Sequence, residues 1–307
     1  MSDYFVSPGE DYKSGYVALV GKPNVGKSTL LNHYMEQKIA AVSLKPQTTR
    51  KRQLGILTTE NAQIIFVDTP GLHSGDYKLS EFINEEARFA FWDSDLILFM
   101  VDASQMPEEE DRKLAEEIRS KPSGSKRLLV LNKIDLAQDS IIDKHEQAYR
   151  ELLTFDDHLR ISAITTVGRS ALLERIIELL PEGPQFFPDE QITNTYERDI
   201  AEDLIRAAAL IHLRDEVPYA IFVRVNEYTL REDGTRYVNA TMFVERDSQK
   251  GIVIGKGGQM IKLISTTARQ EIEEMSGEPV YLELSVKVEK NWRNNPEFLK
   301  RYGLSHE

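Results

Sequence analysis

Residues 21–28 read Gly-Lys-Pro-Asn-Val-Gly-Lys-Ser, which fits the spacing G-x-x-x-x-G-K-S of a phosphate-binding loop. An apolar run at 16–20 precedes this stretch, and a helical pattern at 28–36 follows it. In such a strand–loop–helix context, backbone N–H groups and the helix N-terminus bind phosphate oxygens. A chance match in a glycine turn is the alternative, and the flanking elements count against it. The stretch therefore predicts a phosphate site at the end of the first strand.

The sequence around this loop alternates between strand and helix patterns. Continuous apolar runs are typical of strands that are buried on both faces of a parallel sheet. They occur at 64–67, 96–101 and 127–131, with a last strand expected at 160–162. Amphipathic, helix-like stretches follow at 80–92, 108–120, 141–153 and 170–180. This order predicts an α/β domain with a mostly parallel, doubly wound sheet.

A linker is expected where Pro181, Gly183, Pro184 and Pro188 lie close together, because proline interrupts both helices and strands. Beyond it, the expected order is α-β-β-α-α-β: helix 193–214, strands 219–230 and 236–245, helices 248–254 and 259–275, and strand 280–288. The 307 residues also suit two cores better than one. We predict a nucleotide domain at 1–182, a linker at 183–191 and an α+β domain at 192–307.

Composition narrows the class of protein. Hydrophobic residues make up 41% of the chain and charged residues 29%, as in globular proteins. With no cysteine, disulfides and thiolate metal sites are excluded. The net charge of −12 means that any surface for nucleic acid must be local. Neither a secretory signal nor a membrane-spanning apolar stretch is present in the sequence, so we expect a cytoplasmic protein, with peripheral membrane contact left open.

Two motifs predict a magnesium–phosphate site. Lys27 would reach the β- and γ-phosphates, and Ser28 would bind Mg²⁺. Asp68 to Gly71 read Asp-Thr-Pro-Gly and follow the apolar run at 64–67. The aspartate can hold Mg²⁺ through water, and the glycine can offer its N–H to the γ-phosphate. Alone this is an ordinary strand-to-turn sequence, but its position after the phosphate loop favours the functional interpretation.

A third motif predicts the base. Residues 132–135 read Asn-Lys-Ile-Asp after the apolar run at 127–131. Asp135 can accept two hydrogen bonds from guanine N1 and N2, a pair of donors that adenine lacks. Ser162 and Ala163 would support the base through backbone contacts, on the evidence of their position alone. The three motifs together predict GTP and GDP as ligands.

A loop that responds to the nucleotide is expected at 46–50, Pro-Gln-Thr-Thr-Arg. A threonine hydroxyl there can bind Mg²⁺ when the γ-phosphate is present, and loss of the phosphate would release the loop. We choose Thr49 over Thr48, and a solvated polar loop is the alternative. The predicted metal ligands are thus Ser28, Thr49 and Asp68. The predicted nucleotide contacts are Gly21, Lys22, Pro23, Asn24, Val25, Gly26, Lys27, Ser28, Thr29, Asp68, Thr69, Pro70, Gly71, Asn132, Lys133, Asp135, Ser162 and Ala163.

In this order the motifs resemble the translation-factor-related bacterial GTPases, and the stretches at 21–28 and 47–50 most resemble the Era family. Leu72 stands where Ras-like enzymes carry a glutamine that positions water, and leucine cannot orient water by hydrogen bonding. The resemblance implies slow intrinsic hydrolysis. In related GTPases an asparagine in the place of Asn24 coordinates K⁺, so Asn24 is either a potassium ligand or a simple turn asparagine. We assign catalytic roles to Asn24, Lys27, Thr49 and Gly71.

The second domain contains Gly-Lys-Gly-Gly at 255–258 between two helical patterns. A G-x-x-G loop lets nucleic-acid backbone approach closely, while adjacent apolar residues hold single-stranded bases. The motif alone is weak, but Lys250 and Lys256 lie beside it, and the order of elements resembles the KH variant of Era proteins. A plain α+β interaction domain is the alternative. Positive charges and one aromatic side chain follow near the C-terminus, with Lys300 and Arg301 beyond them. The predicted RNA contacts are Lys250, Ile254, Gly255, Lys256, Gly257, Gly258, Lys287, Lys290, Trp292 and Arg293.

The Era resemblance implies binding near the 3′ end of small-subunit (16S) ribosomal RNA, a role in small-subunit assembly, and some membrane association. We expect a monomeric GTP-gated RNA-binding switch. One alternative is a GTPase for a membrane or protein partner, with the KH-like domain as an adaptor. Another is a P-loop enzyme that transfers phosphate to a small acceptor, which the guanine motif disfavours.

Overall fold

A computed structural model describes residues 11–42, 49–70, 77–120 and 124–306. The chain divides into two compact units. The first contains residues 1–37, 50–72 and 84–194, and the second contains residues 38–49, 73–83 and 195–307. Two short stretches from the N-terminal half thus group with the C-terminal unit. No described helix has the length and apolar character that crossing a membrane requires.

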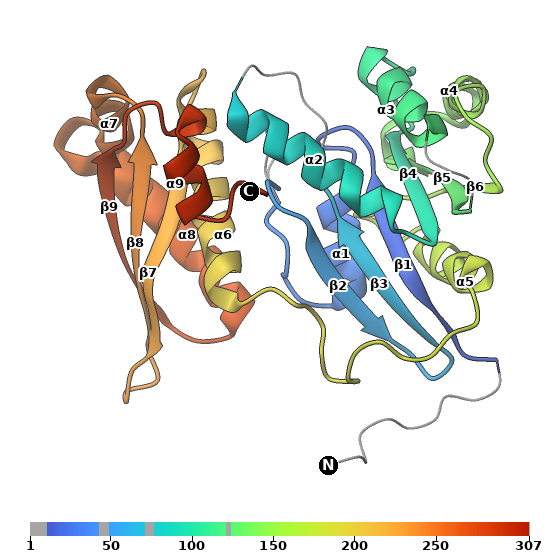
Figure 1. The fold of residues 1–307 in the computed structure, drawn as a ribbon, viewed down its shortest axis with the longest axis horizontal. Helices are drawn as coiled ribbons and strands as arrows, with labels where there is room; N and C mark the ends of the chain where they lie inside the picture. The colour runs from blue at the N-terminus through green and yellow to red at the C-terminus, as the bar shows by residue number, and fades with distance from the viewer. Residues whose placement is uncertain (1–10, 43–48, 71–76, 121–123, 307) are drawn as a thin grey trace. The chain divides into compact units, whose positions relative to one another are not determined.

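The first unit is built on a six-stranded sheet in the order β2-β3-β1-β4-β5-β6 (Figure 1). Its strands are β1 (Lys13–Val20), β2 (Gln53–Thr58), β3 (Ala62–Asp68), β4 (Leu96–Asp102), β5 (Lys126–Asn132) and β6 (Asp157–Arg160). β2 is antiparallel to β3, and the other neighbouring pairs are parallel. The predicted fold, a mostly parallel α/β sheet, is confirmed.

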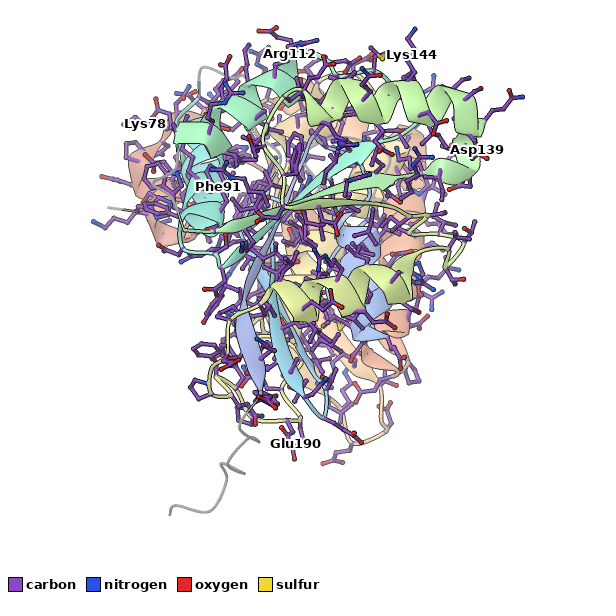
Figure 2. All side chains as sticks on the ribbon, turned by 90° about the vertical axis from the view of Figure 1, so that its right-hand side faces the viewer. Lys78, Phe91, Arg112, Asp139, Lys144 and Glu190 are labelled. Atoms are coloured by element: carbon purple, nitrogen blue, oxygen red, sulfur yellow. The ribbon has the colours of Figure 1, made fainter. Side chains whose placement is uncertain are left out.

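Helices cover both faces of this sheet. They are α1 (Lys27–Met35), α2 (Lys78–Trp92), α3 (Glu109–Ser120), α4 (Asp139–Arg150) and α5 (Arg169–Leu179), with a short 3₁₀ turn η1 (Ile134–Leu136) after β5. Phe91 of α2 is buried with apolar residues of α3, α4 and strands β1, β4 and β5, which forms the core on one face. Arg112 and Lys144 project outward from the same layer (Figure 2). Tyr34 of α1 stacks on Phe66 of β3 on the other face.

Two strands differ from the prediction. β2 was not expected, because an antiparallel edge strand interrupted by Gly55 has no continuous apolar run. β6 ends at Arg160, where the predicted strand begins, since its four residues are all half-buried and carry no clear pattern. Both errors concern the outermost strands of this sheet. These strands are not fully buried on two faces, so their sequences lack the continuous apolar run of a central strand.

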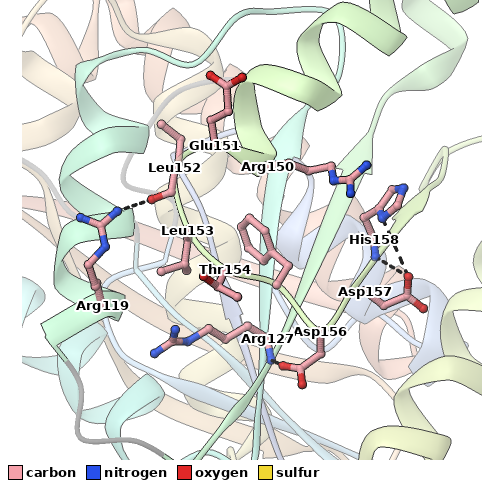
Figure 3. Close-up of a pocket in the computed structure, with 11 residues that line it drawn as sticks. Arg119, Arg127, Arg150, Glu151, Leu152, Leu153, Thr154, Asp156, Asp157 and His158 are labelled. Atoms are coloured by element: carbon pink, nitrogen blue, oxygen red, sulfur yellow. Dashed lines mark hydrogen bonds and ion pairs between the residues drawn. The ribbon is translucent and has the colours of Figure 1, made fainter.

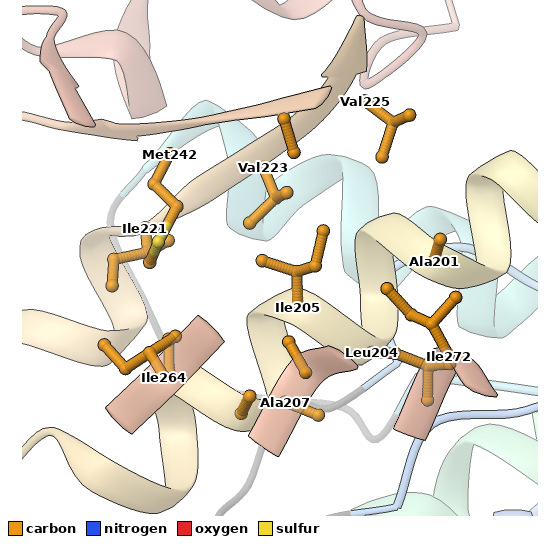
Figure 4. Packing of buried hydrophobic residues seen from close by; sticks show 14 of the residues in the cluster. Ala201, Leu204, Ile205, Ala207, Ile221, Val223, Val225, Met242, Ile264 and Ile272 are labelled. Carbon is orange, nitrogen blue, oxygen red and sulfur yellow. The ribbon is translucent and has the colours of Figure 1, made fainter. Parts of the chain in front are cut away.

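The second unit combines helices with a three-stranded sheet in the order β7-β8-β9. Its elements are α6 (Glu197–His212), η2 (Val217–Ala220), β7 (Phe222–Leu230), β8 (Arg236–Val244), α7 (Asp247–Ile254), η3 (Lys256–Gly258), α8 (Gln259–Ser276) and β9 (Val280–Val288). β7 and β8 are antiparallel, and β8 and β9 are parallel. Apolar side chains such as Leu204 of α6, Val223 of β7 and Ile264 of α8 form its core (Figure 4). The predicted α-β-β-α-α-β order is confirmed.

The chain ends in η4 (Trp292–Asn294) and α9 (Pro296–Arg301). Asn295 caps α9 by accepting hydrogen bonds from the N–H groups of Glu297 and Phe298. A second apolar cluster holds these elements: it contains Leu79, Phe82, Ile83, Phe222, Trp292, Phe298, Leu299 and Leu304.

Candidate functional site

The phosphate loop lies between β1 and α1, as predicted. Gly26 has a φ of 106° and immediately precedes α1. A Cβ atom on Gly26 would lie 2.2 Å from Asn132 Nδ2, so only glycine fits both this backbone and this close approach. Asn24 adopts a left-handed φ of 64°, which asparagine tolerates, and is exposed. Of the other predicted contacts in this region, Pro23 and Thr29 are half-buried, and Gly21 and Val25 are buried.

Lys27 is buried under this loop. Its ammonium donates hydrogen bonds to the carbonyl oxygens of Gly21, at 2.8 Å, and Lys22, at 2.9 Å. Burial lowers the pKa of Lys27 to about 8, against an opposing effect of Asp68. A desolvated cation at the base of the loop is suited to binding phosphate oxygens, because their charge would relieve the cost of burial.

Ser28 and Asp68 meet although they lie forty residues apart in the chain. The Ser28 hydroxyl donates to Asp68 Oδ2 at 2.8 Å. A hydroxyl and a carboxylate form a hard oxygen donor set, which fits Mg²⁺ bound with substrate phosphates and water. Thr69 was predicted to contact the nucleotide, but its hydroxyl donates a hydrogen bond to Leu19 O at 2.7 Å, which connects the residue after β3 to β1. Pro70 is buried beside it.

Asn132 connects three of the predicted motifs. Its Nδ2 donates to Val25 O in the phosphate loop at 2.7 Å. Its Oδ1 accepts from the N–H of Ala163 at 2.9 Å. The sequence suggested contact with nucleotide, whereas the side chain holds the phosphate loop and the loop after β6 together. Ser162 braces that second loop, since its hydroxyl accepts from Thr165 N at 3.1 Å.

The base side of the site is more open. Asp135 is exposed in η1, where its carboxylate can reach a base. Lys133 has a left-handed φ of 65°, and its ammonium lies 2.7 Å from Asp102 Oδ2. Burial acts to raise the pKa of Asp102, but hydrogen bonds from Lys133 and Ser104 outweigh it and hold the pKa below its usual value. Asp102 was not identified in the sequence, because nothing in its spacing distinguishes it from a strand end.

Four residues singled out in the sequence have other outcomes. Thr49 is half-buried at the edge of a described segment. Gly71 and Leu72 lie outside the described residues. The side chain of Lys22 does not extend toward the phosphate loop's own backbone, but contacts carboxylates of Glu108 and Asp111 at the start of α3.

The glycine loop of the second unit separates α7 from α8, as expected. Gly257 has a φ of 59°, and a Cβ atom built on it would meet no atom within 4 Å. The backbone at this point is therefore open to a close neighbour. Gly255 and Gly258 also have positive φ angles. Ile254 is half-buried against the core, while Ile252 and Leu263 are exposed beside the loop. Leu263 was missed, because it falls inside the pattern of a surface helix.

The basic residues near this loop are of two kinds. Lys256, Lys287 and Lys290 are exposed, and Lys250 is half-buried. Arg293 is mostly buried: its guanidinium lies 2.5 Å from Glu245 Oε2 and 3.9 Å from the centre of the Tyr77 ring. The first group can meet phosphate, whereas the charge of Arg293 is already paired.

The prediction that Trp292 stacks on RNA is wrong. Its side chain is 0% exposed, and its indole N–H donates to Ala220 O at 2.9 Å. Phe222 and Phe298 pack against the ring. No face remains for a base, so Trp292 is a core residue that anchors the C-terminal segment.

A cavity of about 680 Å³ lies at the amino ends of β5 and β6, opposite the nucleotide motifs (Figure 3). Three arginines line it, but two of them serve the ends of helices. Arg119 donates to Leu152 O, and Arg127 donates to Ile118 O at 3.4 Å. Ile118 O is one of the carbonyl groups that the end of α3 leaves unpaired, and Leu152 O lies just beyond the end of α4. The cavity therefore has a structural explanation.

Known families match both units. The profile of the family described as 50S ribosome-binding GTPase matches residues 16–133, and that of the KH domain matches residues 216–293. GTPase Era of Syntrophus aciditrophicus (strain SB) is 43% identical over 297 residues, which cover 96% of this chain and 96% of that relative. GTPase Era of Geobacter metallireducens is 43% identical over 295 residues, which cover 96% of this chain and 98% of that relative.

Two solved structures are similar over nearly the whole chain. Era in complex with MgGDPNP and nucleotides 1506–1542 of 16S ribosomal RNA has a TM-score of 0.88 at 37% identity, covering 96% of this chain and 99% of that one. A variant of Aquifex aeolicus Era bound to GDP·AlF₄⁻ has a TM-score of 0.89 at 36% identity, covering 95% of this chain and 99% of that one. With a phosphate loop, a guanine motif and a KH domain in one chain, this protein belongs to the Era family of GTPases.

Proposed function

We propose that this GTPase is a GTP-gated switch that binds the 3′ region of 16S ribosomal RNA and acts in assembly of the small ribosomal subunit. One observation carries the proposal: the same chain holds a nucleotide site joined through Asn132 and, in its other unit, an open glycine loop between two helices. The related Era bound to MgGDPNP and 16S nucleotides supports it. We propose a monomer in the cytoplasm, with peripheral membrane contact as a further property.

The predicted site residues would have separate roles in hydrolysis. Ser28 and Asp68 would hold Mg²⁺, which supplies charge neutralisation between the β- and γ-phosphates. In hydrolysis a water oxygen bonds to the γ-phosphorus while the bond to the bridging oxygen breaks, which gives inorganic phosphate and GDP. Negative charge develops on the bridging oxygen. Lys27 would move its hydrogen bonds from the carbonyls of Gly21 and Lys22 to these phosphates. Thr49 and Gly71 would sense the γ-phosphate.

Asn24 is proposed to bind K⁺ beside the phosphates, in the electrostatic place of an arginine finger. Asn24 is exposed in the phosphate loop and has a left-handed backbone. Turnover should be faster in potassium than in sodium buffer, and Asn24→Ala should remove the difference. Equal wild-type rates in the two buffers would contradict this role.

Coupling between nucleotide and RNA is proposed to run through residues 38–49 and 73–83. These stretches flank the predicted Thr49 loop and the segment after Gly71, and they belong to the second unit. Lys38 lies 2.6 Å from Glu271 and 2.9 Å from Glu274 of α8. Phe82 is buried in the cluster that contains Trp292. A change in either stretch on hydrolysis would therefore reach the RNA-binding unit directly.

RNA retention tests the proposal against a membrane or protein adaptor. Gly257→Asp places a negative charge at the open glycine loop, and should abolish retention of an oligonucleotide with the 16S 3′ sequence at moderate salt. Gly257→Asn is the matched control: it has the same shape and tolerates the left-handed backbone, but lacks the charge. It should retain more RNA than the aspartate variant. Retention that is unchanged in both variants would favour the adaptor.

A further inference from the structure

Lys22 connects the phosphate loop to α3. Its ammonium lies 2.7 Å from Glu108 Oε2 and 2.9 Å from Asp111 Oδ2. The Lys22 side chain is 8% exposed and that of Asp111 is 0% exposed, whereas Glu108 is largely in solvent. Asp111 Oδ2 also accepts from Glu108 N at 2.9 Å, so one carboxylate both caps the start of α3 and holds the lysine.

The contacts with Glu108 and Asp111 favour the charged form of Lys22. Burial acts to lower the pKa of Lys22, but hydrogen bonds to Glu108 and Asp111 outweigh it and raise the pKa above its usual value. Removing one member of a buried ion pair leaves the other charge uncompensated. The lysine would then have only the exposed Glu108 as a partner, and its backbone would lose a fixed anchor.

The anchor matters because of what the Lys22 backbone does. Its carbonyl oxygen accepts a hydrogen bond from the Lys27 ammonium at 2.9 Å. The next residues are Pro23 and then Asn24, whose φ is left-handed. A displacement of the Lys22 backbone would therefore shift both the Lys27 ammonium and the turn at Pro23 and Asn24. Misplacement of about 1 Å in such groups costs up to about a hundredfold in rate.

We propose that Asp111 is a positioning residue for the phosphates: acting through Lys22, it holds the phosphate loop in its binding shape. The Asp111 carboxylate contacts the Lys22 side chain and acts by fixing the backbone of the phosphate loop. The inference rests on the proposed nucleotide contacts of the loop.

Competition against a fluorescent GDP analogue tests this inference, with GDP and guanosine as competitors. Asp111→Asn should weaken GDP binding about tenfold or more, as loss of a supporting partner does, and leave guanosine binding within about twofold. Lys22→Met should weaken GDP binding to a similar extent, whereas Lys22→Arg should keep most of the GDP affinity. The double variant Lys22→Met, Asp111→Asn should bind GDP no more weakly than either single variant. Glu109→Gln is the matched control, because Glu109 lies in the same turn of α3 but pairs with Lys113 at 3.6 Å.

Three results would overturn the inference. One is GDP affinity unchanged by Asp111→Asn. Another is parallel loss of GDP and guanosine binding, which would mean general damage to the fold. The third is additive effects of the two substitutions. A wild-type protein that binds no GDP would instead overturn the nucleotide assignment itself, so the two failures are distinguishable.

Discussion

Lys27 links GTP affinity to pH. In the free protein burial lowers its pKa to about 8, and bound phosphate stabilises the charged form. Binding at higher pH must therefore be accompanied by proton uptake, which costs affinity. GTP affinity should fall about tenfold between pH 7 and pH 9. Titration calorimetry in buffers of different ionisation enthalpy would measure both the affinity and the proton uptake. Lys27→Met should bind weakly at every pH, and a flat wild-type profile would rule the linkage out.

We propose that Asp135 selects guanine as the base. Asp135→Asn replaces an acceptor pair with an amide that can donate, so preference should move from GTP toward XTP. The ratio of the two dissociation constants measures the change, and Asp139→Asn, on the first residue of α4, is a control. An unchanged ratio would count against the whole nucleotide assignment.

Residue roles could be predicted from the sequence where the chemistry is local. The phosphate loop and the guanine motif are contiguous, so roles for Lys27, Ser28 and Asp135 could be predicted from spacing alone. Lys22 and Asp111 lie almost ninety residues apart, and only the fold brings them together. The burial of Trp292 depends on Phe222 and Phe298, which belong to other elements, so an aromatic residue in a basic stretch suggested the wrong role.

At the scale of elements, the strands of the first unit that are buried on two faces were predictable, and the two edge strands of that sheet were not. β4 is buried at all seven positions and was found almost to the residue. β2 has mixed burial and β6 is half-buried throughout, and their positions are set by pairing with β3 and β5 rather than by their own sequences.

Helix α6 contains an acid that links stability to pH. Burial raises the pKa of Glu202 to about 7. The hydrogen bond from Val225 N–H and the charge of Arg224 act to lower this pKa, whereas the charges of Asp199 and Asp203 act to raise it. The folded state keeps a proton on Glu202 that the unfolded state releases. The contribution of Glu202 to the free energy of unfolding is therefore greatest below about pH 4.3 and is lost as the pH rises through about 7. Glu202→Gln should remove this slope and stabilise the second unit by on the order of 3 kcal/mol at pH 8.

Urea unfolding followed by Trp292 fluorescence, in a Trp92→Phe background, would report on this unit alone. Glu197→Gln is the control, because that side chain lies in the first turn of α6 and is half exposed. It should keep the slope. A pH dependence that survives Glu202→Gln would assign the titration to another group.

At the scale of the whole molecule, a GTP-gated switch must obey reciprocity. If GTP rather than GDP raises RNA affinity by some factor, RNA must raise the preference for GTP over GDP by the same factor, typically about 5- to 150-fold. Both ratios can be measured by fluorescence titration with an oligonucleotide of the 16S 3′ sequence.

Lys38→Met removes the lysine held by Glu271 and Glu274, so both ratios should shrink toward one together while guanosine binding stays unchanged. Lys113→Met, which removes an exposed pair on α3, should leave both ratios intact. Wild-type ratios above one that persist in Lys38→Met would place the coupling elsewhere, and wild-type ratios equal to one would mean that the protein binds GTP and RNA independently.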